Sequence, residues 1–308
     1  MAIRFDGKVA IVTGAGNGLG RSHAMALAAR GAKVVVNDLG ASVTGSGADL
    51  SAAQQVVNDI IAAGGEAIVN GANVTDVAQV NEMIEQTMAT WGRIDILVNN
   101  AGILRDKTFA KMSLDDFRLV VDVHLMGAVN CSKAVWDIMR EQQSGTIIMT
   151  TSSSGLYGNF GQSNYGAAKM GLVGLMNTLH LEGQKYGIKV KAISPCAATR
   201  MLDGLVDQQA SEVLTVESVS AGLVFLASDL APSRLVLAAG AGGYAAARIV
   251  ETEGIYLPPD QQTPENVAQH LSQILDLSQS TLLSEGNQQT LKFVDKAVAH
   301  AHLAQVTQ

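Results

Sequence analysis

The sequence predicts an α/β protein built on a doubly wound parallel sheet, and three observations support this prediction. Short apolar runs typical of strands alternate with longer helical stretches from residue 8 to about residue 193. A glycine-rich turn joins the first run to the first helical stretch. Of the 308 residues, 47% are hydrophobic but only 4% are aromatic, which suits a large buried sheet packed with small aliphatic side chains. Such an alternation implies right-handed crossovers between parallel strands.

The first strand is expected at residues 8–13, and the helical stretch that follows its glycine loop continues to about Arg30 and ends at Gly31. Further strands are expected at 33–38, 67–69, 94–98, 146–149 and 188–193, separated by helical stretches near 50–63, 76–90, 114–140 and 163–186. Residues 39–49 are rich in Gly and Ser and form a loop that is longer than a usual connection. In such a sheet the ligand lies beyond the carboxyl ends of the strands.

The last sixty residues differ in kind from the alternating region. Thr263-Pro264-Glu265 is a helix start, with Thr as the cap and Pro at the first helical position, and a second helix is expected at about 288–304. Neither helix resembles another crossover of the sheet. We therefore expect a main domain over residues 1–248 and a helical extension over 249–308. This extension either packs as part of the same domain or serves as a lid or dimer arm.

Composition favours a small molecule as the partner. The net charge of −7 and the lack of a Lys/Arg cluster disfavour nucleic acid. The apolar runs are too short to span a bilayer and no signal-peptide profile precedes the first strand, so we expect a soluble, cytoplasmic chain without a membrane partner. Cys131 and Cys196 form neither a disulfide framework nor a metal spacing, and we expect both to be reduced packing residues.

The glycine-rich turn predicts a dinucleotide site. The pattern is Thr-Gly-x-x-x-Gly-x-Gly over residues 13–20, whereas the strict Gly-x-Gly-x-x-Gly fingerprint is absent because Leu19 and Arg21 occupy its last position in either register. Backbone that turns sharply against a pyrophosphate leaves no room for side chains, and the helix that follows offers unpaired amides and the positive end of its dipole. This context indicates a Rossmann-type domain.

A second set of residues predicts proton transfer at an alcohol or carbonyl group. Tyr165 and Lys169 are four residues apart at the start of a helical stretch, so their side chains share one face. An ammonium held nearby favours the phenolate and lowers the tyrosine pKa from its ordinary value of about 10. Ser152 ends a strand thirteen residues before the tyrosine and can hydrogen-bond the oxygen of the substrate.

Asp38 predicts the choice between the two nicotinamide cofactors. It ends the second strand eighteen residues after Gly20, where a carboxylate can accept hydrogen bonds from both hydroxyls of the adenosine ribose and would repel a 2′-phosphate. This position favours NAD over NADP. The simpler interpretation is that Asp38 merely begins the following loop.

These motifs, together with the Asn99–Gly102 turn and the Pro195–Thr199 segment, resemble the short-chain dehydrogenase/reductase family over about residues 5–248. The resemblance implies an NAD-binding catalytic domain in which Ser152, Tyr165 and Lys169 are catalytic. The cofactor-binding residues that it implies are Gly14, Gly16, Asn17, Gly18, Leu19, Gly20, Asp38, Asn73, Val74, Asn100, Ala101, Gly102, Tyr165, Lys169 and Thr199. No metal site is expected.

Longer stretches resemble the (3R)-hydroxyacyl-CoA dehydrogenase subgroup of that family, the kind found in peroxisomal multifunctional enzymes of type 2. The stretches are Val36–Gly40, Asn99–Asp106, Ile147–Thr150 and Gly155–Gln162. The resemblance implies a stand-alone enzyme of lipid metabolism that oxidises a (3R)-3-hydroxyacyl-CoA to the 3-oxoacyl-CoA with NAD. It also implies a homodimer or homotetramer that pairs through the helical stretches at 114–140 and 163–186.

The chain departs from the family pattern at three positions. His124 stands where most members have a catalytic asparagine, and we expect it to play a supporting role in the catalytic set or to be a core histidine. Asn73 replaces an aspartate that contacts adenine in many members, and its amide can still form a hydrogen bond. Cys196 replaces a glycine, and no base accompanies its thiol.

The substrate remains open among several alternatives. Arg105, Lys107 and Lys111 could meet the phosphates of CoA, although basic residues on a loop are more often simply solvated. The same catalytic residues would serve an NAD-linked hydroxysteroid or other secondary-alcohol dehydrogenase. A 3-oxoacyl carrier-protein reductase that uses NADPH is a further alternative, against which Asp38 argues. A binding protein without chemistry would be expected to lack Tyr165 or Lys169.

Overall fold

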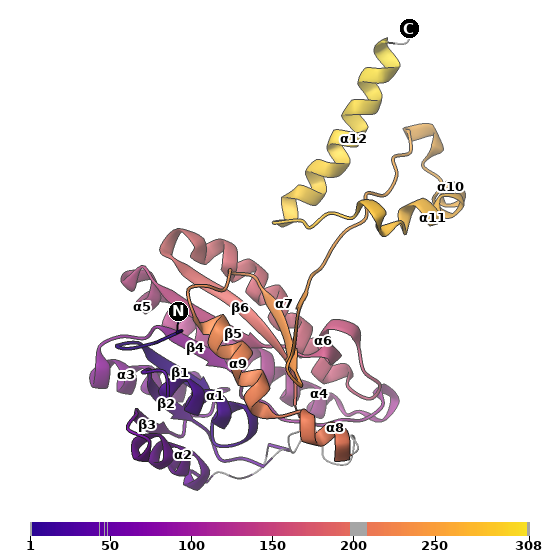
Figure 1. Ribbon diagram of the computed structural model, residues 1–308. Coiled ribbons are helices and arrows are strands. Elements are labelled where there is room, and N and C mark those ends of the chain that lie inside the picture. Colours follow the sequence, from indigo (N-terminus) through magenta and orange to yellow (C-terminus); the bar gives the residue numbers. More distant parts are fainter. Residues whose placement is uncertain (1, 43, 46, 48, 198–207, 307–308) are drawn as a thin grey trace. The chain divides into compact units, whose positions relative to one another are not determined.

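The computed structural model describes residues 2–42, 44–45, 47, 49–197 and 208–306. In the described chain eight strands form one sheet in the order β3-β2-β1-β4-β5-β6-β7-β8, parallel from β3 to β7, with β8 antiparallel at the edge (Figure 1). The strands are β1 (Val9–Thr13), β2 (Lys33–Asn37), β3 (Glu66–Asn70), β4 (Ile96–Asn99), β5 (Gly145–Thr150), β6 (Ile188–Cys196), β7 (Val236–Gly240) and β8 (Gly243–Ala247).

Helices connect the strands and continue into the last sixty residues. They are α1 (Gly18–Ala28), α2 (Ser51–Ala62), α3 (Val77–Trp91), α4 (Leu114–Val121), α5 (Gly127–Gln142), α6 (Ser153–Tyr157), α7 (Ser163–Gly183), α8 (Gln208–Val213), α9 (Val216–Ala227), α10 (Pro264–Gln269), α11 (Leu271–Ile274) and α12 (Gly286–Val306). A π-helical turn at Asp122–Met126 lies between α4 and α5.

Both faces of the sheet are buried, because side chains alternate between two apolar clusters along each central strand. In β2, for example, Val34 and Val36 belong to one cluster with α1, α2 and α9, while Val35 belongs to the other with α3, α5 and α7. The expected doubly wound fold is therefore confirmed, and it places the carboxyl ends of β1, β2, β4 and β5 side by side at one edge of the sheet.

Some elements differ from those expected. The single helical stretch at 114–140 is divided into α4, the π-helical turn and α5. The strands β7 and β8 were not expected, because they consist largely of Ala and Gly, which have low strand propensity. Their pairing with β6 and with each other supplies the stability that their composition lacks.

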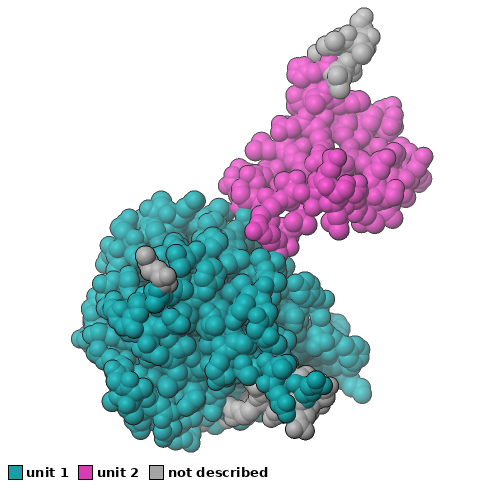
Figure 2. Space-filling view, viewed as in Figure 1, with its two compact units in different colours: residues 1–247 teal, residues 248–308 magenta. Residues whose placement is uncertain are grey.

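The chain divides into two compact units, residues 1–247 and 248–308 (Figure 2). Within the second unit, Thr263 caps α10 as expected by accepting a hydrogen bond from the Asn266 amide. Lys292 and Lys296 of α12 bind the segment 251–253 through ion pairs with Glu251 and Glu253. No residue of this unit whose burial is described is fully buried.

The two cysteines lie in different surroundings. Cys131 is buried as expected, whereas Cys196 is exposed, so the expectation that Cys196 packs in the interior is wrong. The reason is its position at the last residue of β6, where the strand leaves the sheet. Among the helices of the described chain, none is both long and apolar enough to cross a membrane.

Candidate active site

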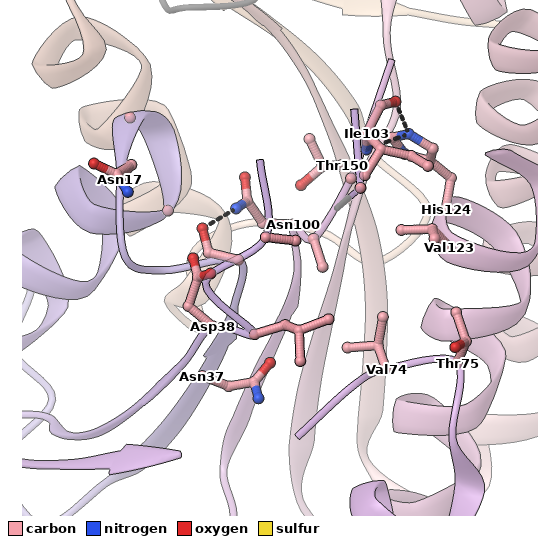
Figure 3. A pocket seen from close by; sticks show the side chains of 18 of the residues that line it. Asn17, Asn37, Asp38, Val74, Thr75, Asn100, Ile103, Val123, His124 and Thr150 are labelled. Atoms are coloured by element: carbon pink, nitrogen blue, oxygen red, sulfur yellow. Dashed lines mark hydrogen bonds between the residues drawn. The ribbon is translucent and has the colours of Figure 1, made fainter. Parts of the chain in front are cut away.

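A cavity of about 430 Å³ opens where the carboxyl ends of the central strands meet (Figure 3). The predicted site residues that line it are Gly14, Asn17, Gly18, Leu19, Gly20, Asp38, Asn73, Val74, Asn100, Ala101, Gly102, His124, Tyr165 and Lys169. Residues at the carboxyl ends of several parallel strands and on the neighbouring helices thus surround one volume, as expected of a ligand site in a parallel sheet.

The glycine loop requires glycine for two different reasons. Gly14 has φ +65°, a backbone conformation that side chains disfavour. Residue 20 must be glycine because there is no room for a side chain: a Cβ there would lie 2.0 Å from the Gly14 carbonyl oxygen. The close approach of these two backbones lets α1 begin directly at the cavity, where the amides of its first turn are suited to binding an anion.

Hydrogen bonds tie this loop to the turn that follows β4. Asn100 Nδ2 donates to the carbonyl oxygens of Thr13 at 2.9 Å and of Gly14 at 3.1 Å. The Thr13 hydroxyl accepts from the backbone amides of Asn100 and Ala101 at 3.0 and 3.1 Å. The two parts of the cavity wall therefore form one rigid unit.

Asp38 lies where β2 ends. Its carboxylate accepts hydrogen bonds from the backbone amides of Gly16 and Gly40, both at 2.7 Å. Each carboxylate oxygen keeps further lone pairs, so the same group can also accept from the hydroxyls of a ribose. Its charge faces the cavity beside the glycine loop.

Asn73 and Val74 continue the wall after β3. The Asn73 side-chain oxygen accepts from the amide and hydroxyl of Thr75, and the Val74 carbonyl accepts from Asn130 at 2.9 Å. The side-chain oxygen of Asn73 is thus engaged within its own turn, so the side-chain NH2 of Asn73 is the group that remains to bind a ligand.

Tyr165, Lys169 and Ser152 meet at the end of β5. Lys169 is buried and donates from Nζ to the Thr150 carbonyl oxygen at 2.6 Å, and its ammonium lies 5.5 Å from the centre of the Tyr165 ring. The Ser152 hydroxyl lies close enough to the Tyr165 phenol to influence its pKa. Ser152 caps α6 through the Ser154 amide, which fixes its position.

The pKa values of this pair differ from the expected pattern. Burial lowers the pKa of Lys169 to about 7. Burial also raises the pKa of Tyr165, and the neighbouring Ser152 side chain opposes this rise only in part. In the protein without ligand, desolvation of the phenol therefore outweighs the lowering of the Tyr165 pKa that a nearby cation would cause.

His124 lies in the π-helical turn and is 3% exposed. Its Nε2 is 2.8 Å from the Ile103 carbonyl oxygen and 3.1 Å from the Ile103 amide nitrogen (Figure 3). Burial, and then the charge of Lys169, hold the pKa of His124 well below its usual value, so the ring is neutral.

Comparisons with known proteins agree with this geometry. The model of the family described as short chain dehydrogenase matches residues 8–210. The chain belongs to the short-chain dehydrogenase family. It is 44% identical over 275 residues to the peroxisomal multifunctional enzyme A of Dictyostelium discoideum, covering 89% of this chain and 61% of that protein. It is 43% identical to a short-chain type dehydrogenase/reductase of Mycobacterium tuberculosis, covering 88% of this chain and 95% of that protein.

Solved structures show the same fold. The full-length peroxisomal multifunctional enzyme type 2 of Drosophila melanogaster aligns with a TM-score of 0.76 at 36% identity, over 98% of this chain and 50% of that one. A short chain dehydrogenase of Mycobacterium avium aligns with a TM-score of 0.77 at 38% identity, over 89% and 96% of the two chains. The chain spans about a third to three fifths of the length of the multifunctional relatives it matches.

As a short-chain dehydrogenase, the protein is an oxidoreductase that acts on CH–OH groups. Enzymes of this family use nicotinamide cofactors, and the cavity fits one. The start of α1 opens onto the cavity through Gly18, Leu19 and Gly20. Among the described residues, the buried Lys169 ammonium donates to one acceptor, the Thr150 carbonyl oxygen. In the described chain no cluster of residues suits a metal ion.

Most, but not all, of the predicted site residues line the cavity of this dehydrogenase. Gly16 and Ser152 lie beside it without lining it, and Thr199 is outside the described residues. Sequence reasoning missed Thr150, whose backbone oxygen binds Lys169, and the structural role of the Thr13 hydroxyl. The sequence signal that could have identified Thr150 is its position at the end of a predicted strand.

The basic residues after the Asn99–Gly102 turn are largely engaged with the protein itself. Arg105 and Lys107 both pair with Asp116, each at 3.2 Å. Arg105 also donates to the Thr44 carbonyl oxygen at 2.9 Å. Lys111 is exposed on the same segment. An anionic substrate would compete with Asp116 for the first two residues.

Proposed function

We propose that this protein is an NAD-dependent (3R)-3-hydroxyacyl-CoA dehydrogenase that yields the 3-oxoacyl-CoA. One observation supports it above the others. A single cavity carries the Asp38 carboxylate beside its glycine loop and the Tyr165–Lys169 pair at the end of β5. The likeness to peroxisomal multifunctional enzymes, whose hydroxyacyl-CoA dehydrogenase units the stretches 36–40, 99–106, 147–150 and 155–162 resemble, supports an acyl-CoA as the substrate class.

Tyr165 is the proposed acceptor of the hydroxyl proton. Its phenol lies beside Ser152, so an oxygen bound between the two side chains would be held in place by both. Because burial raises the Tyr165 pKa, the phenolate needs a cation close by when the proton moves. Lys169 is the protein group placed to provide it.

The nicotinamide cofactor, when bound, supplies the carbon that accepts the hydride from the alcohol carbon. Lys169 would hold the nicotinamide ribose through its ammonium, and that contact would favour the charged form of the lysine. Loss of the hydroxyl proton to Tyr165 and of the hydride from carbon leaves the ketone, so charge and electrons balance.

Asp38 supports NAD as the cofactor. Its two oxygens are fixed by the amides of Gly16 and Gly40, so the carboxylate cannot rotate away without losing both bonds. A 2′-phosphate placed against it would meet a fixed negative charge, and such a contact costs several kcal/mol.

A hydroxysteroid is the second candidate substrate. A 7α-hydroxysteroid dehydrogenase complexed with NADH and 7-oxo glycochenodeoxycholic acid aligns with this chain with a TM-score of 0.70 at 28% identity, over 78% of this chain and 96% of that one. The catalytic set would serve such an alcohol equally well, because only the cleft walls distinguish the two substrates.

The test is the initial rate of NADH formation with matched (3R)- and (3S)-3-hydroxyacyl-CoA esters. Parallel assays replace NAD with NADP, and the esters with a hydroxysteroid. We expect (3R)-selective reduction of NAD. Turnover of the steroid without turnover of either ester would replace the acyl-CoA assignment, and a preference for NADP would overturn the cofactor assignment.

A further inference from the structure

The loop at residues 103–113, which follows the turn after β4, is bonded to the segment that leads into α7. The Lys107 amide donates to the Gly161 carbonyl oxygen at 2.9 Å. The side chain of Gln162 donates from Nε2 to the Asp106 carboxylate at 2.6 Å. Asp106 and Gln162 are the last residues of two of the stretches that resemble the hydroxyacyl-CoA dehydrogenase subgroup, so these two stretches meet in the folded chain.

Asn164 adds a third connection and carries it to Tyr165. Its side chain is fully buried and forms hydrogen bonds at both ends of its carboxamide. Nδ2 donates to the Arg105 carbonyl oxygen at 3.1 Å, and Oδ1 accepts from the Tyr165 backbone amide at 2.8 Å. That amide lies in the first turn of α7, where backbone N–H groups have no partner within the helix. Asn164 therefore fixes the backbone that carries the cavity-lining side chain of Tyr165.

Arg105 continues the connection toward the loop that follows β2. Its guanidinium donates from Nε to the Thr44 carbonyl oxygen of that loop at 2.9 Å, and it pairs with Asp116 at 3.2 Å. Ser42 and Gly45 of the same loop line the cavity. A guanidinium donates from a rigid planar fork, so these two partners fix its position. Residue 105 is thus held from two sides, by the loop after β2 through its side chain and by α7 through its carbonyl oxygen.

We infer that Arg105 and Asn164 are positioning residues that together hold the Tyr165 hydroxyl in a fixed place relative to the loop after β2. Neither residue lines the cavity, so each acts through its neighbours and not on the reacting atoms. A loop that is already held loses less conformational freedom when a cofactor binds, so the Arg105 side chain favours cofactor binding. The effect on the rate rests on the proposed function, whereas the effect on cofactor binding rests only on the family's use of nicotinamide cofactors.

Arg105→Met and Lys107→Met test the contact with the loop after β2. Each substitution removes an ion pair of 3.2 Å with Asp116, but only the first removes the hydrogen bond to Thr44. We expect Arg105→Met to weaken NADH binding at least about threefold in a fluorescence titration, and Lys107→Met to leave it unchanged. The titration is repeated with NADPH, so that the test holds for either cofactor.

Two results would contradict this role of Arg105. The same cofactor affinity in the two methionine variants would overturn the inference. A raised KM for the acyl-CoA ester as the sole effect of Arg105→Met would assign the residue to the substrate instead.

Asn164→Leu tests the contact with Tyr165, because leucine has a similar size but can form neither hydrogen bond. A misplacement of about 1 Å in a catalytic site can cost on the order of 100-fold in rate, so kcat should fall by about that factor. NADH affinity should stay within about threefold of that of the parent, since a substitution that misplaces only the proton acceptor lowers kcat and not binding.

Gln142→Leu is the matched control for the loss of a bonded carboxamide. Gln142 bonds the backbone amide and carbonyl of Ile94 at 3.0 and 2.7 Å, near the starts of β4 and β5 and thus at the opposite edge of the sheet from the cavity. We expect this variant to lower the denaturation midpoint, as Asn164→Leu does, but to keep the kcat of the parent. Equal losses of kcat in the two leucine variants would reduce Asn164 to a support of the fold.

Asn164→Ser keeps the test available if leucine prevents folding. The serine hydroxyl can serve one of the two partners of the carboxamide, so kcat should lie between the values for the parent and the leucine variant. A kcat equal to that of the parent would overturn the role of Asn164.

A double-mutant cycle with Arg105→Met and Asn164→Leu decides whether the two residues act together. We expect Arg105→Met to lower kcat about tenfold in the parent, but to add less than about a threefold further loss in the Asn164→Leu background, which departs from additivity. Independent, multiplying losses would overturn the inference. If the parent oxidises neither 3-hydroxyacyl-CoA ester, the proposed function fails, while the cofactor titrations and turnover of a hydroxysteroid still decide the roles of Arg105 and Asn164.

Discussion

The Asp38 carboxylate and the Gly16 amide form a 2.7 Å hydrogen bond that joins the end of β2 to the glycine loop. A Cβ at residue 16 would lie 2.9 Å from the same carboxylate oxygen, so any larger residue there would push the Asp38 carboxylate away from the amide. Asp38 therefore shapes the loop in addition to presenting its charge. Substitutions of Asp38 must therefore distinguish the loss of this hydrogen bond from the loss of the negative charge.

Replacing Asp38 with Ser should relax the preference for NAD. Removing the fixed charge ends the repulsion of a 2′-phosphate, so the ratio of kcat/KM with NADP to that with NAD should rise at least about tenfold, which corresponds to about 1.4 kcal/mol. Because Ser also loses the bonds to Gly16 and Gly40, affinity for NAD should fall. Asp38→Asn is the matched control, since it keeps one acceptor oxygen without the charge. An unchanged ratio in both variants would exclude Asp38 as the discriminating group.

Gly20→Ala should weaken cofactor binding. The new Cβ would lie 2.0 Å from the Gly14 carbonyl oxygen and 2.6 Å from Asn100 Nδ2, so the loop and the turn after β4 must separate. We expect NADH affinity, measured by fluorescence titration, to fall at least about tenfold, the equivalent of about 1.4 kcal/mol.

Gly174→Ala is the control for this substitution. Gly174 is exposed within α7, and a Cβ there would meet nothing within 4 Å. Alanine in a helix interior is about 0.5–1 kcal/mol more favourable than glycine, so this variant should gain stability and bind NADH normally. Equal affinities for NADH in the two alanine variants would show that the Gly14–Gly20 contact is not needed for binding.

The sequence was sufficient for the fold and for most of the site, because strand ends and glycine spacing are local signals. It could not show that Asn100 binds Thr13 and Gly14, since these residues are more than eighty positions apart and meet only through the pairing of β1 with β4. It also could not reveal the raised pKa of Tyr165. That shift depends on burial, which the motif spacing does not encode.

Lys191 should make stability depend on pH in the alkaline range. It is fully buried on β6 and donates to the carbonyl oxygens of Leu226 and Ser228 at 2.6 and 3.0 Å. Burial lowers its pKa to about 8. Between pH 8 and about 10.4, the ordinary pKa of lysine, the unfolded chain binds a proton that the native protein lacks, so the free energy of unfolding rises with pH.

The measurement compares denaturant unfolding of the parent and Lys191→Met from pH 7 to 10. Above pH 8 the free energy of unfolding of the parent should rise relative to that of the variant by up to about 1.4 kcal/mol per pH unit. Below pH 8 the difference between the two free energies should be constant. The unpaired carbonyl groups left in the variant shift this difference by the same amount at every pH. Parallel curves over the whole range would show that Lys191 does not titrate in the native protein.

Tyr165→Phe tests the proposed chemistry most directly. Phenylalanine keeps the ring that packs against His124 but removes the hydroxyl that takes the proton. Loss of a general acid or base typically lowers turnover by about 10² to 10⁴. We therefore expect kcat for (3R)-3-hydroxyacyl-CoA oxidation to fall by a factor in this range, while NADH binding, measured by fluorescence, stays close to that of the parent.

Tyr157→Phe is the matched control, because Tyr157 is 76% exposed and lies outside the cavity, so the turnover of this variant should equal that of the parent. Comparable turnover in the two variants would remove Tyr165 from the mechanism, and loss of NADH binding in Tyr165→Phe alone would assign the residue to cofactor binding instead.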